Sequence, residues 1–280
     1  MESISKNLII FLTGDYYHRN VKNINYVKSL QIHIINPCIE ANLNVIICVG
    51  CYEHQKKGWE DNLSKNINIP VYVFTNIPDE KALENEYNRF FYSTHVTDKY
   101  RYMHNYGKQY YTYTLLCDLF EKKNINIDYI LRTRIDIIYC TNMFFQPNWL
   151  ENICDKNIIC HSASEFHGGP CHNASGTSFN RWADIRNDLY LVCDQFIFGN
   201  LFIMDKFFKL YKCDKILQNS LNSNTSLGIE CIIANYYLLN NIKVAAVELC
   251  FLNPSITDCY NETNLICSDA KPSSYIKYFN

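Results

Sequence analysis

Arg132, Arg134 and Asp136 alternate within one largely apolar segment, Leu131–Tyr139. If this segment is an extended strand, the three side chains fall on one face. Two guanidinium groups there could grip phosphate oxygens, and the carboxylate could hold Mg²⁺, Mn²⁺ or a ribose hydroxyl. Such a set could neutralise a diphosphate leaving group as its bond to a sugar breaks. An internal Arg–Asp salt bridge at a strand end explains the same spacing equally well.

Strands and helices must position these charges. Short apolar runs predict strands at Lys6–Leu12, Leu43–Val49, Ile69–Phe74 and Tyr129–Arg132. Apolar residues at helical spacing predict one helix over Ile24–Ile35, limited by Pro37, and another over Lys108–Lys122. A polar loop is expected through Glu53 and Lys57. This alternation indicates an α/β fold with a mostly parallel central sheet flanked by helices.

Open α/β sheets bind ligands beyond the carboxyl ends of their strands. That edge should carry Arg132, Arg134 and Asp136, and also Thr13-Gly14-Asp15, which ends the first strand. As turn residues, Thr13, Gly14 and Asp15 need no ligand. The charged motif is therefore the first candidate for a site.

The second half of the chain is less regular. We predict strands at Asn157–His161 and Asp194–Phe198, a helix containing Met204, Phe207, Phe208 and Tyr211, and a helix over Gly228–Leu239. Ser162–Asn187 is expected to be a long surface loop of the kind that often binds ligands. No repeat or linker divides the sequence. We expect a single domain over residues 1–280, with a nucleotide-binding half to about residue 140 and an irregular half after it.

Composition narrows the possible partners. The chain has 26 basic and 28 acidic residues, a net charge of -2, and therefore no field that attracts nucleic acid. No apolar stretch approaches the ~20 residues of a membrane span, and no signal peptide is visible, so a soluble cytoplasmic protein is expected. Most of the 14 cysteines lie in apolar segments and are expected to be reduced core residues. Cys48 and Cys51 have the spacing of half a zinc site or a redox pair, without a second pair to complete it.

Tyr129–Asp136, preceded by Lys108-Gln109, resembles the WavE-like lipopolysaccharide and capsule glycosyltransferases. In that family a basic-Gln pair opens a helix, and the next strand ends in a basic-Thr-Arg-x-Asp segment. Asp194-Gln195-Phe196 with Phe198-Gly199 is similar to the family's Asp-aromatic-Gly strand, and Glu230 opens a helix. The matches cover Lys108–Leu239, about half of the chain.

The resemblance implies a GT-A-type fold and a nucleotide-sugar donor, UDP- or GDP-linked. Arg132, Arg134 and Lys108, with Gln109 beside it, would then meet the diphosphate. Asp136 would replace the family's Asp-x-Asp motif as the ligand of Mn²⁺ or Mg²⁺ or of the ribose. Because Arg134 stands where the first Asp of that motif is expected, the metal site lacks one carboxylate. Thr13, Gly14 and Asp15 would meet the nucleotide base and ribose.

The same resemblance implies roles for two further carboxylates. Asp194 would be the general base that deprotonates an acceptor hydroxyl in an inverting transfer, or a strand-end cap. Glu230 would orient the acceptor or cap its helix. One of three loop histidines could be a metal ligand, although exposure is the simpler interpretation of His161, His167 and His172.

The expected function is thus transfer of a sugar from a nucleotide-diphosphate donor to a glycan or other hydroxyl acceptor. The absence of Asp at position 134 also allows a non-catalytic binding or structural protein with the same fold. A nucleotidyltransferase is the third possibility, but Leu12–Tyr16 has one Gly and no Lys where such enzymes usually have a Gly-rich basic loop.

Overall fold

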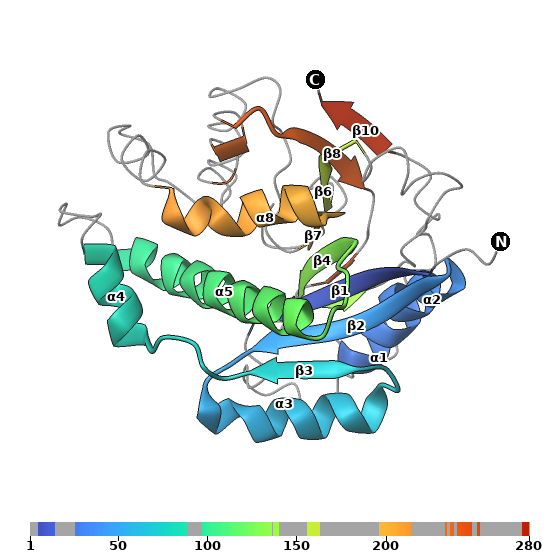
Figure 1. Cartoon of the computed structure of the whole chain (residues 1–280), viewed down its shortest axis with the longest axis horizontal. Helices are drawn as coiled ribbons and strands as arrows, with labels where there is room; N and C mark the ends of the chain where they lie inside the picture. The colour runs from blue at the N-terminus through green and yellow to red at the C-terminus, as the bar shows by residue number, and fades with distance from the viewer. Residues whose placement is uncertain are drawn as a thin grey trace.

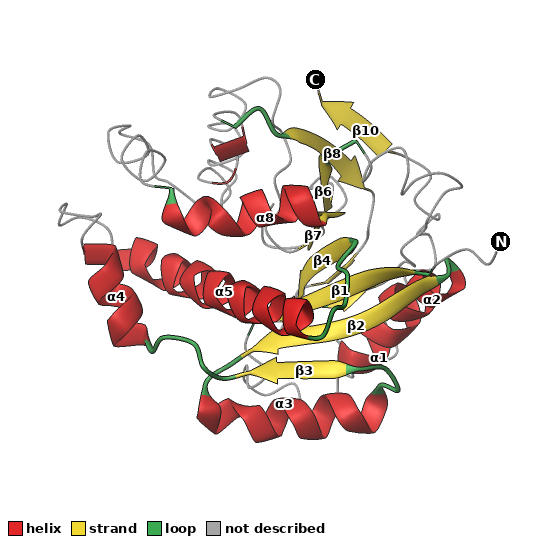
Figure 2. Cartoon of the chain, in the orientation of Figure 1, coloured by secondary structure: helices red, strands yellow, loops and turns green. Residues whose placement is uncertain are grey.

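The central feature is an eight-stranded sheet with the strand order β10-β8-β6-β7-β4-β1-β2-β3 (Figures 1 and 2). The computed structural model describes residues 5–14, 26–88, 97–135, 137–139, 156–162, 196–213, 233, 236–237, 240–247, 251–252 and 276–279. Four strand pairings are parallel and three antiparallel. The predicted α/β class, with a mostly parallel sheet and flanking helices, is confirmed.

The parallel strands that lead to the charged motif are β1 (Lys6–Thr13), β2 (Leu43–Gly50), β3 (Val71–Phe74) and β4 (Tyr129–Arg134). They were predicted because β1, β2 and β4 are buried on both faces and are therefore almost continuously apolar. The remaining strands of the sheet are β6 (Ile158–Ser162), β7 (Phe196–Asn200), β8 (Lys243–Val247) and β10 (Ile276–Phe279). A separate antiparallel pair joins β5 (Ile138–Tyr139) to β9 (Phe251–Leu252).

Helices cover both faces of the sheet. One face packs against α1 (Tyr26–Leu30), a π-helical segment η1 (Gln31–Ile35), α2 (Asn36–Glu40) and α3 (Glu53–Asn66). The other packs against α4 (Glu80–Asn88), α5 (Thr97–Lys122), α8 (Leu201–Lys209) and the 3₁₀ turn η4 (Leu210–Lys212). Figure 1 shows α5 and α8 lying along the same side of the sheet. No helix of the described segments has the length and apolarity needed to cross a bilayer.

Pro37 does not end the first helical segment, so that prediction was wrong. The helical segment continues from α1 through η1 into α2 and ends at Glu40. Pro37 lies in the first turn of α2, and the preceding π turn is closed by a bond from Asn36 N–H to Gln31 O. A proline is tolerated there because its missing N–H is not required by the first turn of a helix.

The predicted polar loop through Glu53 and Lys57 is helix α3, a second correction. Its start is stabilised because the Gln55 side chain accepts a hydrogen bond from Tyr52 N–H at 3.2 Å. Among its described side chains, two large ones, Trp59 and Leu63, anchor it in the core, and both are buried. Few apolar residues therefore marked the helix in the sequence.

Candidate functional site

The carboxyl ends of β1 and β4 meet at one edge of the sheet. Thr13 is the register partner of Arg134 in this parallel pair. The Thr13 hydroxyl donates to Thr133 O at 3.2 Å, and Ile135 N–H donates to Thr13 O at 2.9 Å. Gly14 follows with a φ of 99°, a conformation that favours glycine, and turns the chain out of the sheet. Thr13, Gly14 and Arg134 are thus adjacent at the carboxyl edge of the sheet, where the sequence predicted them.

Arg132 lies one side-chain repeat deeper in β4 and is 3% exposed. Its Nε donates to Oε1 of Gln109 on α5 at 3.0 Å. Its guanidinium carbon is 5.9 Å from the ring centroid of Tyr106, also on α5. Within the described part of the chain, Arg132 Nη1 is buried and has no hydrogen-bond partner. The side chain is held at one nitrogen and leaves another available for an acceptor.

The charge of Arg132 has no carboxylate to balance it in the part of the chain that the structure describes. A guanidinium keeps its proton in a protein interior, so this is a buried cation. Burying an uncompensated charge costs several kcal/mol, and an anionic ligand would offset much of that cost.

Gln109 and Lys108 are neighbours on α5 but lie in different environments. Gln109 is 4% exposed and holds Arg132, so its side chain supports that cation rather than facing solvent. Lys108 is half-buried, with Nζ 5.2 Å from the ring centroid of Tyr52, just after β2. Its charge partly offsets the effect of burial, which raises the pKa of Cys51 to about 11. The two residues therefore reach the ends of β4 and β2 respectively.

Lys108-Gln109 does not open its helix, contrary to the sequence-based interpretation. α5 begins at Thr97, so the pair lies in the helix interior. Gly107, which precedes the pair, is a packing position: a Cβ there would lie 2.9 Å from side-chain atoms of Leu83 and Tyr211. A helix can tolerate glycine at about 1 kcal/mol where two elements approach this closely.

Several predicted site residues lie outside the described part of the chain: Asp15, Asp136, Asp194, Gln195, Glu230, His167 and His172. β4 ends at Arg134 and Ile135 begins a turn, so the structure describes strand alternation for Arg132 and Arg134. Among the residues that the structure describes, no three His, Cys, Asp or Glu side chains group as a metal site.

His161 is fully buried, which corrects the interpretation that it is exposed. Its Nε2 lies 2.8 Å from the hydroxyl of Tyr237, which is also fully buried. His161 and Arg132 are both register partners of Ile197 on β7, one on each side. His161 lies two residues after Ile159 on β6, so these two side chains share one face of the sheet, and Ile158 lies on the other face. The apolar Ile159 was the sequence signal that His161 is buried.

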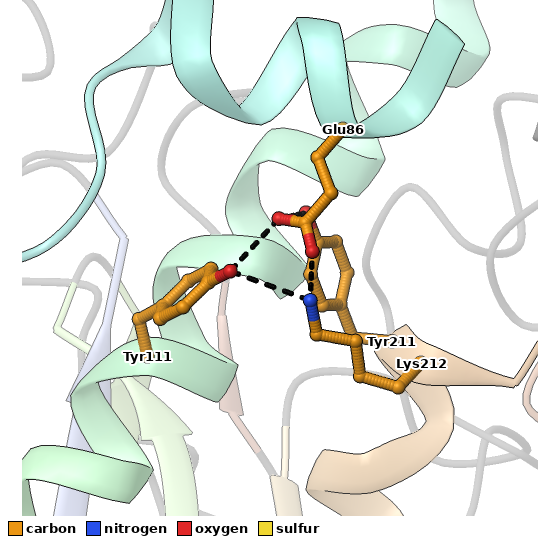
Figure 3. Close-up of polar contacts among 4 residues, drawn as sticks. All are labelled: Glu86, Tyr111, Tyr211 and Lys212. Atoms are coloured by element: carbon orange, nitrogen blue, oxygen red, sulfur yellow. Dashed lines mark hydrogen bonds and ion pairs between the residues drawn. The ribbon is translucent and has the colours of Figure 1, made fainter. Parts of the chain in front are cut away.

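A second polar cluster joins α4, α5 and η4 (Figure 3). Glu86 Oε2 accepts from the hydroxyls of Tyr111 at 2.9 Å and Tyr211 at 3.1 Å, and Glu86 forms an ion pair with Lys212. Lys212 Nζ lies 5.1–5.3 Å from the ring centroids of Tyr110, Tyr111 and Tyr211. Unlike Arg132, Lys212 has a carboxylate, so this cluster has no unmatched charge for a ligand.

No protein-family model matches the chain, and no curated protein matches it in sequence. Among solved structures it is similar to the crystal structure of mouse xyloside xylosyltransferase 1 in its apo form. That likeness has 11% identity and a TM-score of 0.45, and covers 85% of this chain and 83% of that chain. The WavE-like resemblance stays a prediction.

Proposed function

We propose that this chain is a glycosyltransferase that uses a nucleotide-diphosphate sugar as its donor and a hydroxyl of a glycan as its acceptor. The observation that carries the proposal is Arg132, a buried guanidinium without a carboxylate and with Nη1 unpartnered among the described residues. Such a cation at the ligand-binding edge of an α/β sheet favours an anionic ligand.

A diphosphate suits the arrangement better than a single carboxylate would. Arg134 follows Arg132 on the same face of β4, and Lys108 reaches the end of β2, so three cations approach one edge from two elements. A diphosphate leaving group gains negative charge as its bond to the sugar breaks. Preorganised cations stabilise that charge more in the transition state than in the bound donor, which accelerates transfer.

The remaining roles follow from the sequence motif. Asp194 would take the proton of the acceptor hydroxyl, whose oxygen forms a new bond to the anomeric carbon. The bond from that carbon to the diphosphate oxygen breaks, and its electron pair leaves with the diphosphate. Attack from the opposite face inverts the anomeric centre. Glu230 would orient the acceptor, and Thr13, Gly14 and Asp15 would contact the nucleoside.

Mn²⁺ or Mg²⁺ is proposed at Asp136, where it would share the charge of the donor diphosphate. Among the described residues, no three His, Cys, Asp or Glu side chains group as a metal site. We assign the phosphate contacts to Arg132, Arg134 and Lys108, and the experiment tests the metal separately.

A thermal-shift screen against UDP-, GDP-, CMP- and dTDP-sugars, each with and without Mn²⁺, tests the proposal. A donor at about 100 times its Kd should raise the Tm by about 5–10 °C. Arg132→Met should lose this rise. A rise that requires Mn²⁺ supports the metal at Asp136, and a rise without it removes the metal from the proposal. If no donor raises the Tm, donor binding is refuted.

Turnover separates the enzyme from the alternative, a non-catalytic donor-binding protein. That alternative is favoured because Arg134 stands where the first Asp of the Asp-x-Asp motif is expected. Transfer to a glycan acceptor should be detected with the wild type and abolished by Asp136→Asn without a change in Tm. Donor binding with no transfer to any acceptor, or full transfer by Asp136→Asn, would contradict the assigned roles.

A further inference from the structure

The link between β4 and β5 begins directly after Arg134. β4 ends at Arg134 and β5 begins at Ile138, so three residues connect the two strands. The two described residues of this link, Ile135 and Ile137, are buried and belong to the core on the α1 side. Both of them therefore pack against the protein interior, next to the strand end that carries Arg134.

The entry to the link is fixed by β1. Ile135 N–H donates to Thr13 O at 2.9 Å, and the Thr13 hydroxyl donates to Thr133 O at 3.2 Å. Thr133 and Ile135 are the neighbours of Arg134 in the chain, so these two bonds flank it. Thr13 thus holds the backbone on both sides of Arg134.

The exit from the link is fixed by α1 and β9. Tyr139 N–H donates to Ser29 Oγ at 2.7 Å, and the Ser29 hydroxyl donates to Tyr139 O at 3.2 Å. A serine hydroxyl has one hydrogen to donate and lone pairs to accept, so it can serve both backbone groups. Tyr139 is also the antiparallel register partner of Phe251 on β9. The backbone of Tyr139 is therefore held from two sides.

A side-chain hydrogen bond joins the exit to the entry. The hydroxyl of Tyr139 is hydrogen-bonded to Oγ1 of Thr133, and both side chains are buried. Successive side chains of a strand point to opposite faces, so Thr133 lies on the face away from Arg132 and Arg134. The bond closes the link on the core side of β4, and the other side of the strand is left to the two arginines.

We propose that Tyr139 and Thr133 are positioning residues that hold Arg134 at the carboxyl edge of the sheet for the diphosphate of the donor. This rests on the proposed function, because it assumes that Arg134 meets a phosphate. Binding groups must be held to within about 0.5 Å of their productive geometry, so the backbone that carries them must be fixed. Fixing it before the ligand arrives removes an ordering cost from binding. Both residues act through the backbone of β4, and neither contacts the reacting atoms.

The experiment measures binding of inorganic pyrophosphate to the full chain by isothermal titration calorimetry. Tyr139→Phe removes only the hydroxyl. Tyr129→Phe is the matched control, since Tyr129 is buried in the same core but its hydroxyl accepts from Lys6 Nζ at 2.7 Å. Tyr129 lies roughly 17 Å from Arg134 along β4. We expect Tyr139→Phe to weaken pyrophosphate affinity about tenfold, and Tyr129→Phe to leave it within about twofold of the wild type.

Thr133 supplies a second pair of variants. Thr133→Val removes the hydroxyl and should also weaken pyrophosphate affinity about tenfold, whereas Thr133→Ser keeps a hydroxyl and should stay within about threefold of the wild type. Equal affinities for these two variants would refute the positioning role. This pair decides the question if Tyr139→Phe does not fold.

The double variant separates positioning from a contribution to stability alone. Thr133→Val with Tyr139→Phe removes both hydroxyls, so neither partner of this bond is left behind, and the Tm should rise above that of the single variants. The link is still not closed, so pyrophosphate affinity should remain about tenfold below that of the wild type. If affinity recovers together with the Tm, the bond only supports the fold and the positioning role is refuted.

Two arginine variants separate the failure of this inference from the failure of the proposed function. If Arg134→Met weakens pyrophosphate binding while Tyr139→Phe and Thr133→Val do not, the positioning role is refuted and the anion site stands. If Arg132→Met weakens binding and Arg134→Met does not, the inference is refuted because Arg134 does not meet the phosphate, and the proposed function stands. If the wild type does not bind pyrophosphate, or both arginine variants bind it normally, both proposals are refuted.

Discussion

At the scale of single residues, we expect Arg132 to contribute to donor binding and to add little to the stability of the fold. Replacing a buried unpaired charge with a well-packed apolar side chain is often neutral or stabilising by about 1–4 kcal/mol. The missing hydrogen bond to Gln109 acts in the opposite direction by about 1–3 kcal/mol. Arg132→Met should therefore change the free energy of unfolding in urea by less than about 2 kcal/mol, while donor affinity falls at least about 100-fold.

Arg132→Lys is the control for charge. A lysine keeps the positive charge but cannot present the planar donor set that meets Gln109 and a phosphate together, so donor affinity should stay well below that of wild type. A loss of more than about 4 kcal/mol in Arg132→Met would contradict this account, because it would show that Arg132 is a paired structural charge.

The Gln109–Arg132 hydrogen bond gives a second residue-scale prediction. Gln109→Leu leaves Arg132 Nε–H buried without an acceptor and should cost about 2–3 kcal/mol of unfolding free energy. In the double variant Gln109→Leu with Arg132→Met, neither partner remains unsatisfied, so stability should recover by at least about 1 kcal/mol. Urea unfolding of the four proteins measures the coupling. Additive effects of the two substitutions would show that the hydrogen bond does not hold Arg132.

At the scale of elements, the sequence predicted the strands β1 to β4, β6 and β7, whereas the strands β5, β8, β9 and β10 and the helices α3 and α4 were not predicted. β1, β2 and β4 are buried on both faces, so their apolar runs identify them without tertiary information. α3 was missed because few of its residues, Trp59 and Leu63 above all, reach the core. The helix at Glu80–Asn88 was also not predicted, since Leu83 is its one buried residue among those with a described side chain.

Site geometry was less predictable than site position. Alternation placed Arg132 and Arg134 on one face, and Thr13 was expected at the same edge. The Gln109–Arg132 bond spans 23 residues and the His161–Tyr237 contact spans 76. Both depend on how helices are seated on the sheet, which periodicity does not determine. No local pattern therefore showed which polar residues would be buried together.

The seating of α5 on β2 depends on Gly50. A Cβ at this position would lie 1.8 Å from Thr112 Oγ1 and 2.8 Å from Thr112 Cβ. Gly50→Ala should cost about 1–3 kcal/mol by overpacking. Thr112→Gly alone should cost about 0.3–0.5 kcal/mol in helix propensity, because threonine is itself a poor helix former. The loss of the packing that the threonine side chain provides adds to this cost.

The double variant is the decisive case for that contact. Gly50→Ala with Thr112→Gly removes the clash, so its loss of stability should be smaller than the sum of the two single losses. Chemical denaturation gives all three values. A Gly50→Ala protein as stable as the wild type would mean that α5 can move away from β2 without cost.

The cluster of Glu86 and Lys212 should stabilise the contact of α4, α5 and η4. Its ion pair is supported by two tyrosine hydroxyls and three rings, and the two side chains are 23% and 36% exposed. A double-mutant cycle with Glu86→Gln and Lys212→Met should give a coupling of about 1 kcal/mol.

The pair of Asp205 and Lys209 is the matched control. It is also an ion pair, at 2.6 Å, but lies within one helix with exposures of 33% and 58%, and the Tyr113 hydroxyl donates to Asp205 Oδ1 at 3.1 Å. Its cycle should give about 0.3–0.5 kcal/mol. Equal couplings for the two pairs would show that the three rings and the second tyrosine hydroxyl add nothing to the Glu86–Lys212 interaction.

At the scale of the whole molecule, the sheet divides the interior into two cores, and buried thiols lie in both. Cys38 and Cys160 belong to the core on the α1 side, and Cys48 belongs to the core beneath α5. Burial raises the pKa of all three thiols above the ordinary value of 9.0. All three should therefore stay protonated in the folded protein at a pH where they ionise in the unfolded chain.

This difference predicts a loss of stability in alkali. Below pH 9 both states hold the three protons, so the thiols favour neither state. Above it the unfolded chain releases them while the folded protein keeps them, so stability falls by about 1.4 kcal/mol per pH unit for each thiol. Urea unfolding between about pH 9.5 and 10.5 should show a decrease of about 3.5–4 kcal/mol from three such thiols. Cys38→Ala removes one titrating group and should reduce that slope by about 1.4 kcal/mol per pH unit, whatever its effect at pH 7. An unchanged slope would show that the Cys38 thiol titrates alike in both states, and that this core admits water.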